Sequence, residues 1–264
     1  MSTSLVERFC TPSFPSLTEF DTKAFNGASI IHHPFNNGHL TCYCQGEGKS
    51  LLLVHGWGSR ASHTALIGRI IAKSGFRVVA YDAPAHSSLK ETGRAETSNF
   101  LEFSRAIVSI SDKLGPFDTI VGHSLGALAS LYAVAGHPQI ADHKISTRKL
   151  VLISLPVSVE RLVQHFCHFH GLNEVDCIKL KKGLEETFHI SIADFTAASA
   201  LQNIEAETLL VHDSDDKDFP ITDIYELHNS FPNSNLCTTS SLGHQKIVMN
   251  RQMIMKISEF LTPG

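Results

Sequence analysis

Short runs of apolar residues recur along the chain from residue 51 onwards, separated by longer stretches whose apolar residues repeat every three or four positions. The first pattern is typical of buried strands and the second of helices. Strands are predicted near residues 51–54, 76–81, 118–121, 149–154, 208–211 and 235–239. Helices are predicted near residues 62–73, 95–114, 125–136, 221–230 and 246–261.

This alternation of strand and helix predicts an α/β protein with a doubly wound, mostly parallel sheet. Two further strands are predicted at residues 28–33 and 39–44, and the turn-rich segment 34–38 joins them as an antiparallel pair. The complete sheet is therefore expected to hold about eight strands.

Two segments depart from the alternation. Residues 1–26 show no strong periodicity, contain Pro12 and Pro15, and are expected to form a lead-in segment. After the strand that ends near residue 154, about fifty residues have helical character, with helices predicted at 159–169, 175–188 and 194–201. A chain of 264 residues is in the size range of one large domain. We expect a single domain over residues 1–264, with a helical insertion at about 156–206.

Composition narrows the class of protein. Hydrophobic residues make up 42% of the chain, enough for a sizeable core, and the net charge of −4 does not favour a nucleic-acid partner. No apolar run has the length of a membrane helix, and the N-terminal residues lack the basic start and apolar core of a leader. The six cysteines do not follow the framework of a small secreted fold. We therefore expect reduced thiols and a cytoplasmic location; oligomeric state is not predicted.

The pentapeptide Gly122-His123-Ser124-Leu125-Gly126 carries the first chemical signal. It stands between a predicted strand and a predicted helix, where the two glycines permit a sharp turn and close packing. The central serine of such a G-x-S-x-G turn projects its hydroxyl from the tip. Ser124 is therefore the candidate nucleophile.

A serine hydroxyl needs a base to take its proton, and the base needs an acid to orient it. The candidate base is His244, which follows Gly243 in the loop before the last predicted helix. Carboxylates crowd the loop after the strand at 208–211, where an open α/β sheet places functional residues. The candidate acids there are Asp213, Asp215, Asp216 and Asp218.

Acyl transfer also needs N–H donors for the negative oxygen of a tetrahedral intermediate. The residue after the nucleophile, Leu125, would supply one backbone N–H. The loop His55-Gly56-Trp57-Gly58, which follows the strand at 51–54, would supply another from Trp57.

Together these segments resemble the α/β-hydrolase superfamily, from about residue 38 to the C-terminus. The segment Asp82-Ala83-Pro84-Ala85-His86-Ser87 is similar to the family's D-x-P-G-H-G, with Ala85 and Ser87 in place of two glycines. This segment and the ending Ser241–His244 look like a group of bacterial hydrolases of undefined substrate. The resemblance implies the α/β-hydrolase fold with a small helical cap at about 156–206. Aligning His212 and Pro220 with the family's H-G-x-x-D-x-x-V-P favours Asp216 as the acid.

The expected function is that of a serine hydrolase acting on a small carboxylic ester or thioester, with the triad Ser124, Asp216 and His244. Amide hydrolysis, C–C bond hydrolysis and acyl transfer on the same triad are alternatives, as is a hydrolase-like sensor of small molecules with little turnover. The expected partner is a small ester-like substrate, and no cofactor or metal is expected.

Two segments partly match the sequence patterns of a phosphate-binding loop and of a zinc site. Gly46-Glu47-Gly48-Lys49-Ser50 ends like a phosphate loop, but Tyr43 stands where the first glycine belongs and a strand follows. The histidines of segment 165–170 make a zinc site conceivable, yet they lack two well-spaced ligand pairs. A hairpin turn and an amphipathic cap helix are the preferred interpretations.

Overall fold

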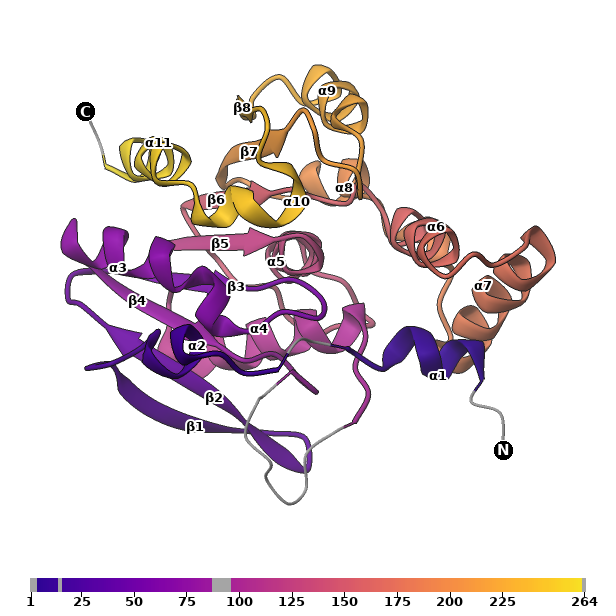
Figure 1. Ribbon diagram of the computed structural model, residues 1–264, viewed down its shortest axis with the longest axis horizontal. Helices are drawn as coiled ribbons and strands as arrows, with labels where there is room; N and C mark the ends of the chain where they lie inside the picture. Colours follow the sequence, from indigo (N-terminus) through magenta and orange to yellow (C-terminus); the bar gives the residue numbers. More distant parts are fainter. Residues whose placement is uncertain (1–3, 14–15, 87–95, 263–264) are drawn as a thin grey trace.

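The computed structural model describes residues 4–13, 16–86 and 96–262 of the chain (Figure 1). Eight strands form one sheet, in the order β1-β2-β4-β3-β5-β6-β7-β8. The strands are β1 Ser29–Phe35, β2 Gly38–Gln45, β3 Lys49–Val54, β4 Phe76–Tyr81, β5 Thr119–His123, β6 Lys149–Ile153, β7 Glu207–Asp213 and β8 Asn235–Thr239. Strand β2 runs antiparallel to both β1 and β4, and the other neighbours are parallel. The predicted fold class is confirmed.

Helices cover both faces of the sheet (Figure 1). They are α1 Leu5–Cys10, α2 Glu19–Lys23, α3 Ala65–Lys73, α4 Phe100–Leu114, α5 Leu125–Ala135, α6 Val159–Phe169, α7 Glu174–Phe188, α8 Ala197–Leu201, α9 Ile221–Ser230, α10 Gly243–Lys246 and α11 Arg251–Leu261. Single turns of 3₁₀ helix are η1 Ala61–Thr64, η2 Ile192–Asp194 and η3 Ile247–Met249. Residue 95 of the predicted helix 95–114 lies outside the described residues, as does Ser87.

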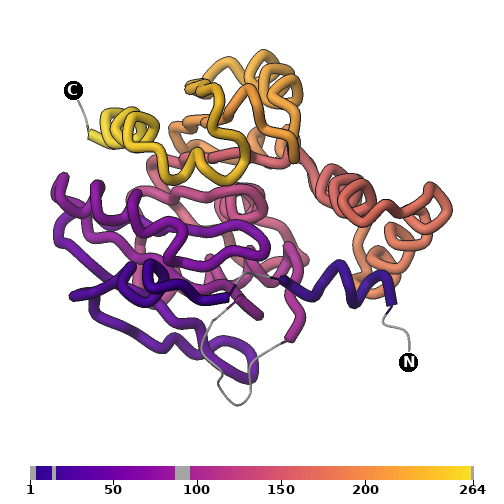
Figure 2. Tube along the Cα trace, viewed as in Figure 1, coloured from indigo at the N-terminus to yellow at the C-terminus, as the bar shows by residue number. Residues whose placement is uncertain are grey.

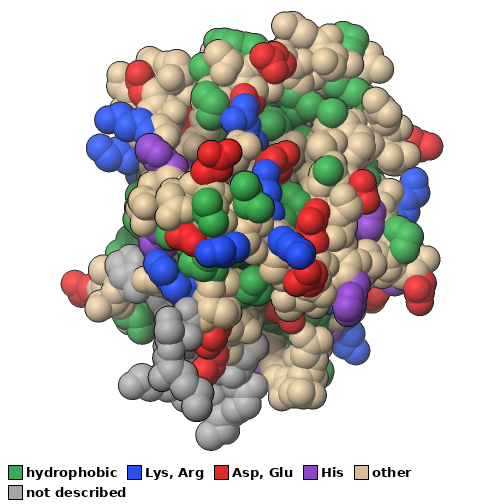
Figure 3. Space-filling model, turned by 90° about the vertical axis from the view of Figure 1, so that its right-hand side faces the viewer, with side chains coloured by type: hydrophobic (Ala, Val, Ile, Leu, Met, Phe, Trp, Pro, Cys, Tyr) green, Lys and Arg blue, Asp and Glu red, His purple; other side chains and the backbone are tan. Residues whose placement is uncertain are grey.

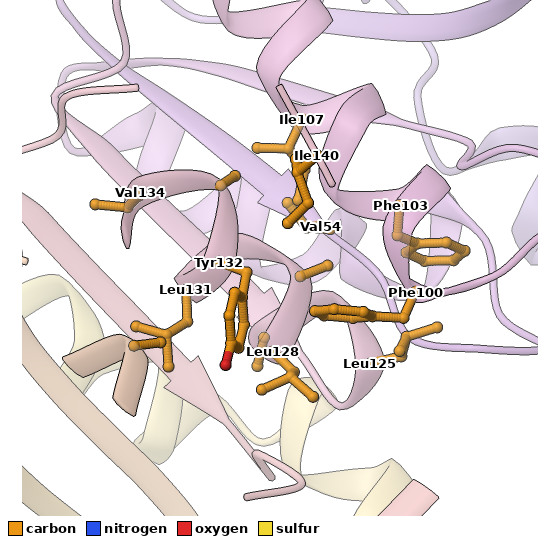
Figure 4. Packing of buried hydrophobic residues seen from close by; sticks show 14 of the residues in the cluster. Val54, Phe100, Phe103, Ile107, Leu125, Leu128, Leu131, Tyr132, Val134 and Ile140 are labelled. Carbon is orange, nitrogen blue, oxygen red and sulfur yellow. The ribbon is translucent and has the colours of Figure 1, made fainter. Parts of the chain in front are cut away.

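The two faces of the sheet bury different side chains, because successive residues of a strand point in opposite directions. Leu52 and Val54 of β3 pack with α4 and α5, whereas Leu51 and Leu53 pack with α3 and α11. Figure 4 shows the first of these layers, with Phe100 and Phe103 of α4 beside Leu128 and Tyr132 of α5. Because α5 is buried along its whole length, it holds the turn that precedes it rigidly against the sheet.

The lead-in at residues 1–26 contains two short helices in its described part, α1 and α2, which were not predicted. These helices have only six and five residues, too few turns for an apolar repeat to show. Each begins at a capping side chain: Ser4 accepts from the N–H of Glu7, and Thr18 forms a capping box with Asp21. In Figures 1 and 2, α1 lies beside α6 and α7, away from the sheet.

Between β6 and β7 the chain forms α6, α7, η2 and α8 in place of a single crossover helix. The expectation of reduced thiols is wrong for one pair, because a disulfide joins Cys167 of α6 to Cys177 of α7. Spacing along the sequence did not reveal this pair, which the turn between the two helices brings together. Within the described ranges, no helix has the length and apolarity needed to cross a membrane.

Candidate active site

A tight turn between β5 and α5 places Ser124 above the ends of the parallel strands. Ser124 has φ 55° and ψ −126°, a conformation that costs energy for a residue with a Cβ atom. A Cβ atom on Gly126 would come within 2.3 Å of the His55 carbonyl oxygen. A Cβ atom on Gly122 would come within 2.6 Å of Ala127 Cα. Both glycines are therefore required by close approach of the backbone, and the packing around them stabilises the strained serine.

Ser124 lies at one end of a row of three hydrogen-bonded side chains. The Nε2 atom of His244 is 2.9 Å from Ser124 Oγ, and its Nδ1 atom is 2.8 Å from Asp216 Oδ2. The three residues come from the ends of β5, β7 and β8, which parallel strands bring to one edge of the sheet. All three are buried.

The environment of Asp216 keeps its carboxylate ionised. Burial favours the neutral form, but hydrogen bonding and charge from His244 and the N–H groups of Phe219 and Asp218 outweigh it, so the pKa of Asp216 is lowered. An ionised carboxylate only accepts hydrogen bonds, so His244 Nδ1 must carry a hydrogen. His244 Nε2 then has a free lone pair that accepts from the Ser124 hydroxyl.

The other aspartates of this loop have different partners. Asp213, at the position of the family's glycine, accepts from the hydroxyl of Thr239 and from the N–H groups of Asp215, Leu242 and Gly243. Burial alone would raise the pKa of Asp213. The hydrogen bonds outweigh burial, so the pKa of Asp213 is lowered. Asp213 thus connects the loop of the acid to the loop of the histidine. Asp215 Oδ2 accepts from Ser241 N at 2.6 Å, and Asp218 Oδ2 lies 3.9 Å from His244 Nε2.

The backbone donors predicted for an oxyanion hole also lie beside Ser124. A Cβ atom on Gly56 would be 3.0 Å from Ser124 Cβ, so the loop after β3 passes close to the serine. Among the described residues, neither the Leu125 N–H nor the Trp57 N–H has a hydrogen-bond partner. Both donors are therefore available to a ligand atom.

His55 fixes the shape of the loop that contains Trp57. Its Nε2 atom accepts from Ala83 N at 2.9 Å, so its Nδ1 atom must donate to the Gly56 carbonyl oxygen at 2.7 Å. Burial lowers the pKa of His55 well below its usual range, which keeps this neutral arrangement. Ala85 of the neighbouring loop adopts φ 64°, in the left-handed region that favours glycine.

Sequence reasoning missed one residue of the site, His123. Its Nε2 atom lies 2.9 Å from the backbone carbonyl oxygen of His244, so it must donate to that oxygen. Burial lowers the pKa of His123 to about 3. The only signal in the sequence was that His123 directly precedes Ser124, and this position does not indicate a bond to the His244 carbonyl.

Within the described residues, one group of three side chains could hold a metal ion: Asp216, Asp218 and His244. His244 already uses one ring nitrogen for Asp216 and the other for Ser124, so the same atoms form the hydrogen-bonded row. The histidines of segment 165–170 do not form such a group in the described part of the chain.

A cavity of about 690 Å³ opens beside Ser124. Its walls come from α1, from α6 and from the loops that follow β3, β5, β7 and β8. Most lining side chains from the helices are apolar, including Phe9, Leu162, Phe166 and Phe169. The cavity therefore suits a small molecule with an apolar part next to the serine hydroxyl.

Comparison with known proteins identifies the fold and its family. Residues 51–228 match a sequence model described as the alpha/beta hydrolase family. No curated protein matches the chain.

Several solved structures share the fold at low sequence identity. An esterase of Pyrococcus furiosus is 18% identical, with a TM-score of 0.66 over 95% of this chain and 96% of its own. A putative lipase from Acinetobacter baumannii AYE is 16% identical, with a TM-score of 0.66 over 94% and 97%. A thioesterase domain from the curacin biosynthetic pathway is 17% identical, with a TM-score of 0.63 over 90% and 100%.

Proposed function

This chain belongs to the alpha/beta hydrolase family, and we propose that it is a serine hydrolase that cleaves a small carboxylic ester or thioester through an acyl-enzyme. The observation that carries the proposal is the row from Ser124 Oγ through His244 to Asp216, at 2.9 Å and 2.8 Å. The names of the similar structures, an esterase, a putative lipase and a thioesterase domain, agree with ester chemistry.

In the first half-reaction Ser124 Oγ attacks the substrate carbonyl carbon, and His244 Nε2 takes the hydroxyl proton. Asp216 holds His244 in the required tautomer and stabilises its positive charge. The N–H groups of Leu125 and Trp57 bind the oxygen that becomes negative. When the intermediate collapses, the bond to the leaving oxygen or sulfur breaks and His244 returns the proton to it.

In the second half-reaction water attacks the acyl-enzyme and gives a proton to His244 Nε2. The acid product leaves as Ser124 Oγ recovers that proton. In both half-reactions His244 Nε2 exchanges protons with the serine oxygen, the leaving group or the attacking water. His244 Nδ1 keeps its hydrogen bond to Asp216 throughout.

We further propose that α6, α7 and α8 form a cap that shapes specificity without supplying a group of the triad. Residues of α6 line the cavity, whereas the hydrogen-bonded row comes from the sheet. Enlarging an apolar cap residue such as Leu162 should therefore change the preference among acyl chain lengths and leave the reactivity of Ser124 toward phosphonates intact.

A panel of p-nitrophenyl esters of graded acyl length, with matched thioesters, tests the proposed reaction. Wild-type protein should release product from at least one class, and Ser124→Ala should lose on the order of 10⁴-fold or more in turnover. Ser230→Ala, a change at an exposed serine of α9 that does not line the cavity, is the control. Equal turnover by Ser124→Ala and wild type would reject the mechanism.

The location in the cell remains a prediction. The cysteine pattern of the sequence predicts a cytoplasmic protein, whereas a disulfide such as that between Cys167 and Cys177 forms more readily in an oxidising compartment. Fractionation of expressing cells, with thiol labelling of the intact protein, would decide between the two.

A further inference from the structure

The N-terminal helix α1 forms one wall of the cavity beside Ser124. It packs on the two helices that follow β6: the ring of Phe9 meets the ring of Phe166 edge-on at 5.2 Å. A Cβ atom on Gly183 of α7 would lie 2.7 Å from Val6 Cγ2. Figures 1 and 2 show α1 beside α6 and α7 at the same end of the molecule.

The segment after α1 connects this wall to the loop of the oxyanion donors. The Cys10 carbonyl oxygen accepts from Ser98 N at 2.8 Å. A Cβ atom on Gly58 would lie 2.7 Å from the Ser13 carbonyl oxygen. The backbone of α1 and of the segment after it is therefore anchored at Cys10 and packed closely at Ser13.

Arg8 of α1 is the one lysine or arginine among the described residues that line the cavity. Its side chain is exposed and has no hydrogen-bond or ion-pair partner within the described part of the chain. The lysines of neighbouring α7 differ, because Lys179, Lys181 and Lys182 each pair with a carboxylate. Figure 3 shows this end of the molecule with acidic and basic side chains interspersed. Arg8 is thus a cation left available to a ligand.

The cavity lined by Arg8 also has apolar walls and the reacting end at Ser124. Phe9, Phe166 and Phe169 supply apolar surface. At the reacting end the carboxylate of Asp218 lies 3.9 Å from His244 Nε2 and would repel an anion. A negative group is therefore favoured at the α1 wall and disfavoured next to Ser124.

We propose that Arg8 binds a carboxylate at the end of the apolar arm of the ester substrate, a step that rests on the proposed hydrolase function. The planar guanidinium matches a carboxylate with two parallel hydrogen bonds. One arginine, with no second arginine or lysine among the described lining residues, suits a monoanion better than a dianionic phosphate. The substrate is thus an ester with an apolar chain between the scissile bond and the carboxylate.

The test compares substrates that differ only in the terminal group. For an acyl arm the pair is p-nitrophenyl hexanoate and the mono-p-nitrophenyl ester of adipic acid. For an alcohol arm the pair is hexyl acetate and 6-acetoxyhexanoate. The readout is the ratio of kcat/KM for the carboxylate substrate to that for its neutral partner, measured for wild type, Arg8→Met, Arg8→Lys and Arg69→Met.

In at least one pair the wild-type ratio should exceed that of Arg8→Met by about tenfold, the worth of one charge-assisted hydrogen-bonded contact. Arg8→Lys should retain part of the ratio, because it keeps the charge without the planar fork. Arg69→Met should equal wild type, since Arg69 is exposed on α3 and does not line the cavity. Turnover of the neutral esters by Arg69→Met should stay within about twofold of wild type, since Arg69 lies outside the cavity.

A ratio that Arg8→Met leaves unchanged in both pairs overturns the role of Arg8, while hydrolysis of the neutral esters keeps the proposed function. A wild-type protein that cleaves no ester and takes no phosphonate at Ser124 overturns both together. The two failures are therefore distinguishable.

Discussion

The imidazole of His123 donates a hydrogen bond to the backbone carbonyl oxygen of His244 across 2.9 Å. Ser124, the next residue, lies 2.9 Å from the His244 ring. The end of β5 thus contacts His244 at two points: Ser124 bonds to its imidazole ring, and His123 bonds to its backbone carbonyl. His123 is therefore proposed as a positioning residue for the base.

His123→Phe should lower kcat about tenfold with little change in KM. The substitution keeps a ring but leaves the His244 carbonyl buried without its donor, a loss worth about 1–3 kcal/mol. Because His123 is not expected to bind the apolar arm of the substrate, ground-state binding should persist. Steady-state kinetics on one p-nitrophenyl ester give both constants, with His33→Phe as a control at a buried histidine bonded to Ser109. A rise in KM at unchanged kcat would contradict the positioning role.

The low pKa of His123 makes stability depend on pH. In the unfolded chain a histidine takes a proton near about pH 6.5, whereas burial lowers the pKa of His123 to about 3 in the folded protein. Between these values the unfolded state binds more protons, so the free energy of unfolding should fall as pH falls from about 6.5 toward 3. Urea titrations at several pH values should show a smaller slope for His123→Phe than for wild type. An identical slope would contradict a neutral, buried His123.

Asp216, Asp215 and Asp213 should respond differently to conversion into asparagine. Asp216→Asn should cost on the order of 10⁴-fold in turnover, because the amide cannot stabilise a charged His244 in the required tautomer. Asp215→Asn should stay within about threefold of wild type, because an amide oxygen can still accept from Ser241 N.

Asp213→Asn places an NH₂ group among N–H donors. It should lower the free energy of unfolding by about 1–3 kcal/mol and lower turnover far less than Asp216→Asn. Kinetics and chemical denaturation of the three variants decide the assignment. If Asp215→Asn loses turnover while Asp216→Asn stays active, the acid of the triad is Asp215 and not Asp216.

Gly126→Ala should destabilise the protein and impair Ser124. Its new Cβ atom would lie 2.3 Å from the His55 carbonyl oxygen and 2.8 Å from that of Val54, so α5 must move away from β3. The expected loss is about 1–3 kcal/mol in the free energy of unfolding, with slower phosphonate labelling. Gly75→Ala is the comparison, since its backbone has φ 86° but no atom lies within 4 Å. Gly75→Ala should lose stability but react with the phosphonate at the wild-type rate. If Gly126→Ala reacts as fast as Gly75→Ala, the effect of the close approach at Gly126 on Ser124 is contradicted.

The parallel part of the fold was predictable because its strands are buried on both faces. Runs such as Leu51–Val54 and Leu150–Ile153 are apolar at every position and leave little ambiguity. Short helix α1 was not predictable, since its six residues gain stability from a capping serine and from Phe9 packing on Phe166, which is distant in sequence. The disulfide between Cys167 and Cys177 likewise depends on how two helices turn back on each other.

At the candidate site, the sequence predicted residues whose position follows from the ends of strands, and the structure brings them together: Ser124, Asp216, His244, Trp57 and Leu125. It could not identify contacts that depend on the distance between loops. Asp213 was one of four candidate acids in its loop, and the structure shows that it is buried and accepts bonds from the loop that contains His244. The bond from His123 to His244 spans 121 positions in the chain, and no local pattern encodes it.

The most direct test of the account is covalent labelling with a fluorophosphonate, followed by mass-spectrometric mapping of the modified peptide. One adduct is expected, on Ser124. It should be absent in Ser124→Ala, form much more slowly in Asp216→Asn and form at the wild-type rate in the control Ser230→Ala. Circular dichroism should show that the unlabelled variants remain folded. An adduct on another serine, or labelling that survives in folded Ser124→Ala, would contradict the central claim that Ser124 is the nucleophile.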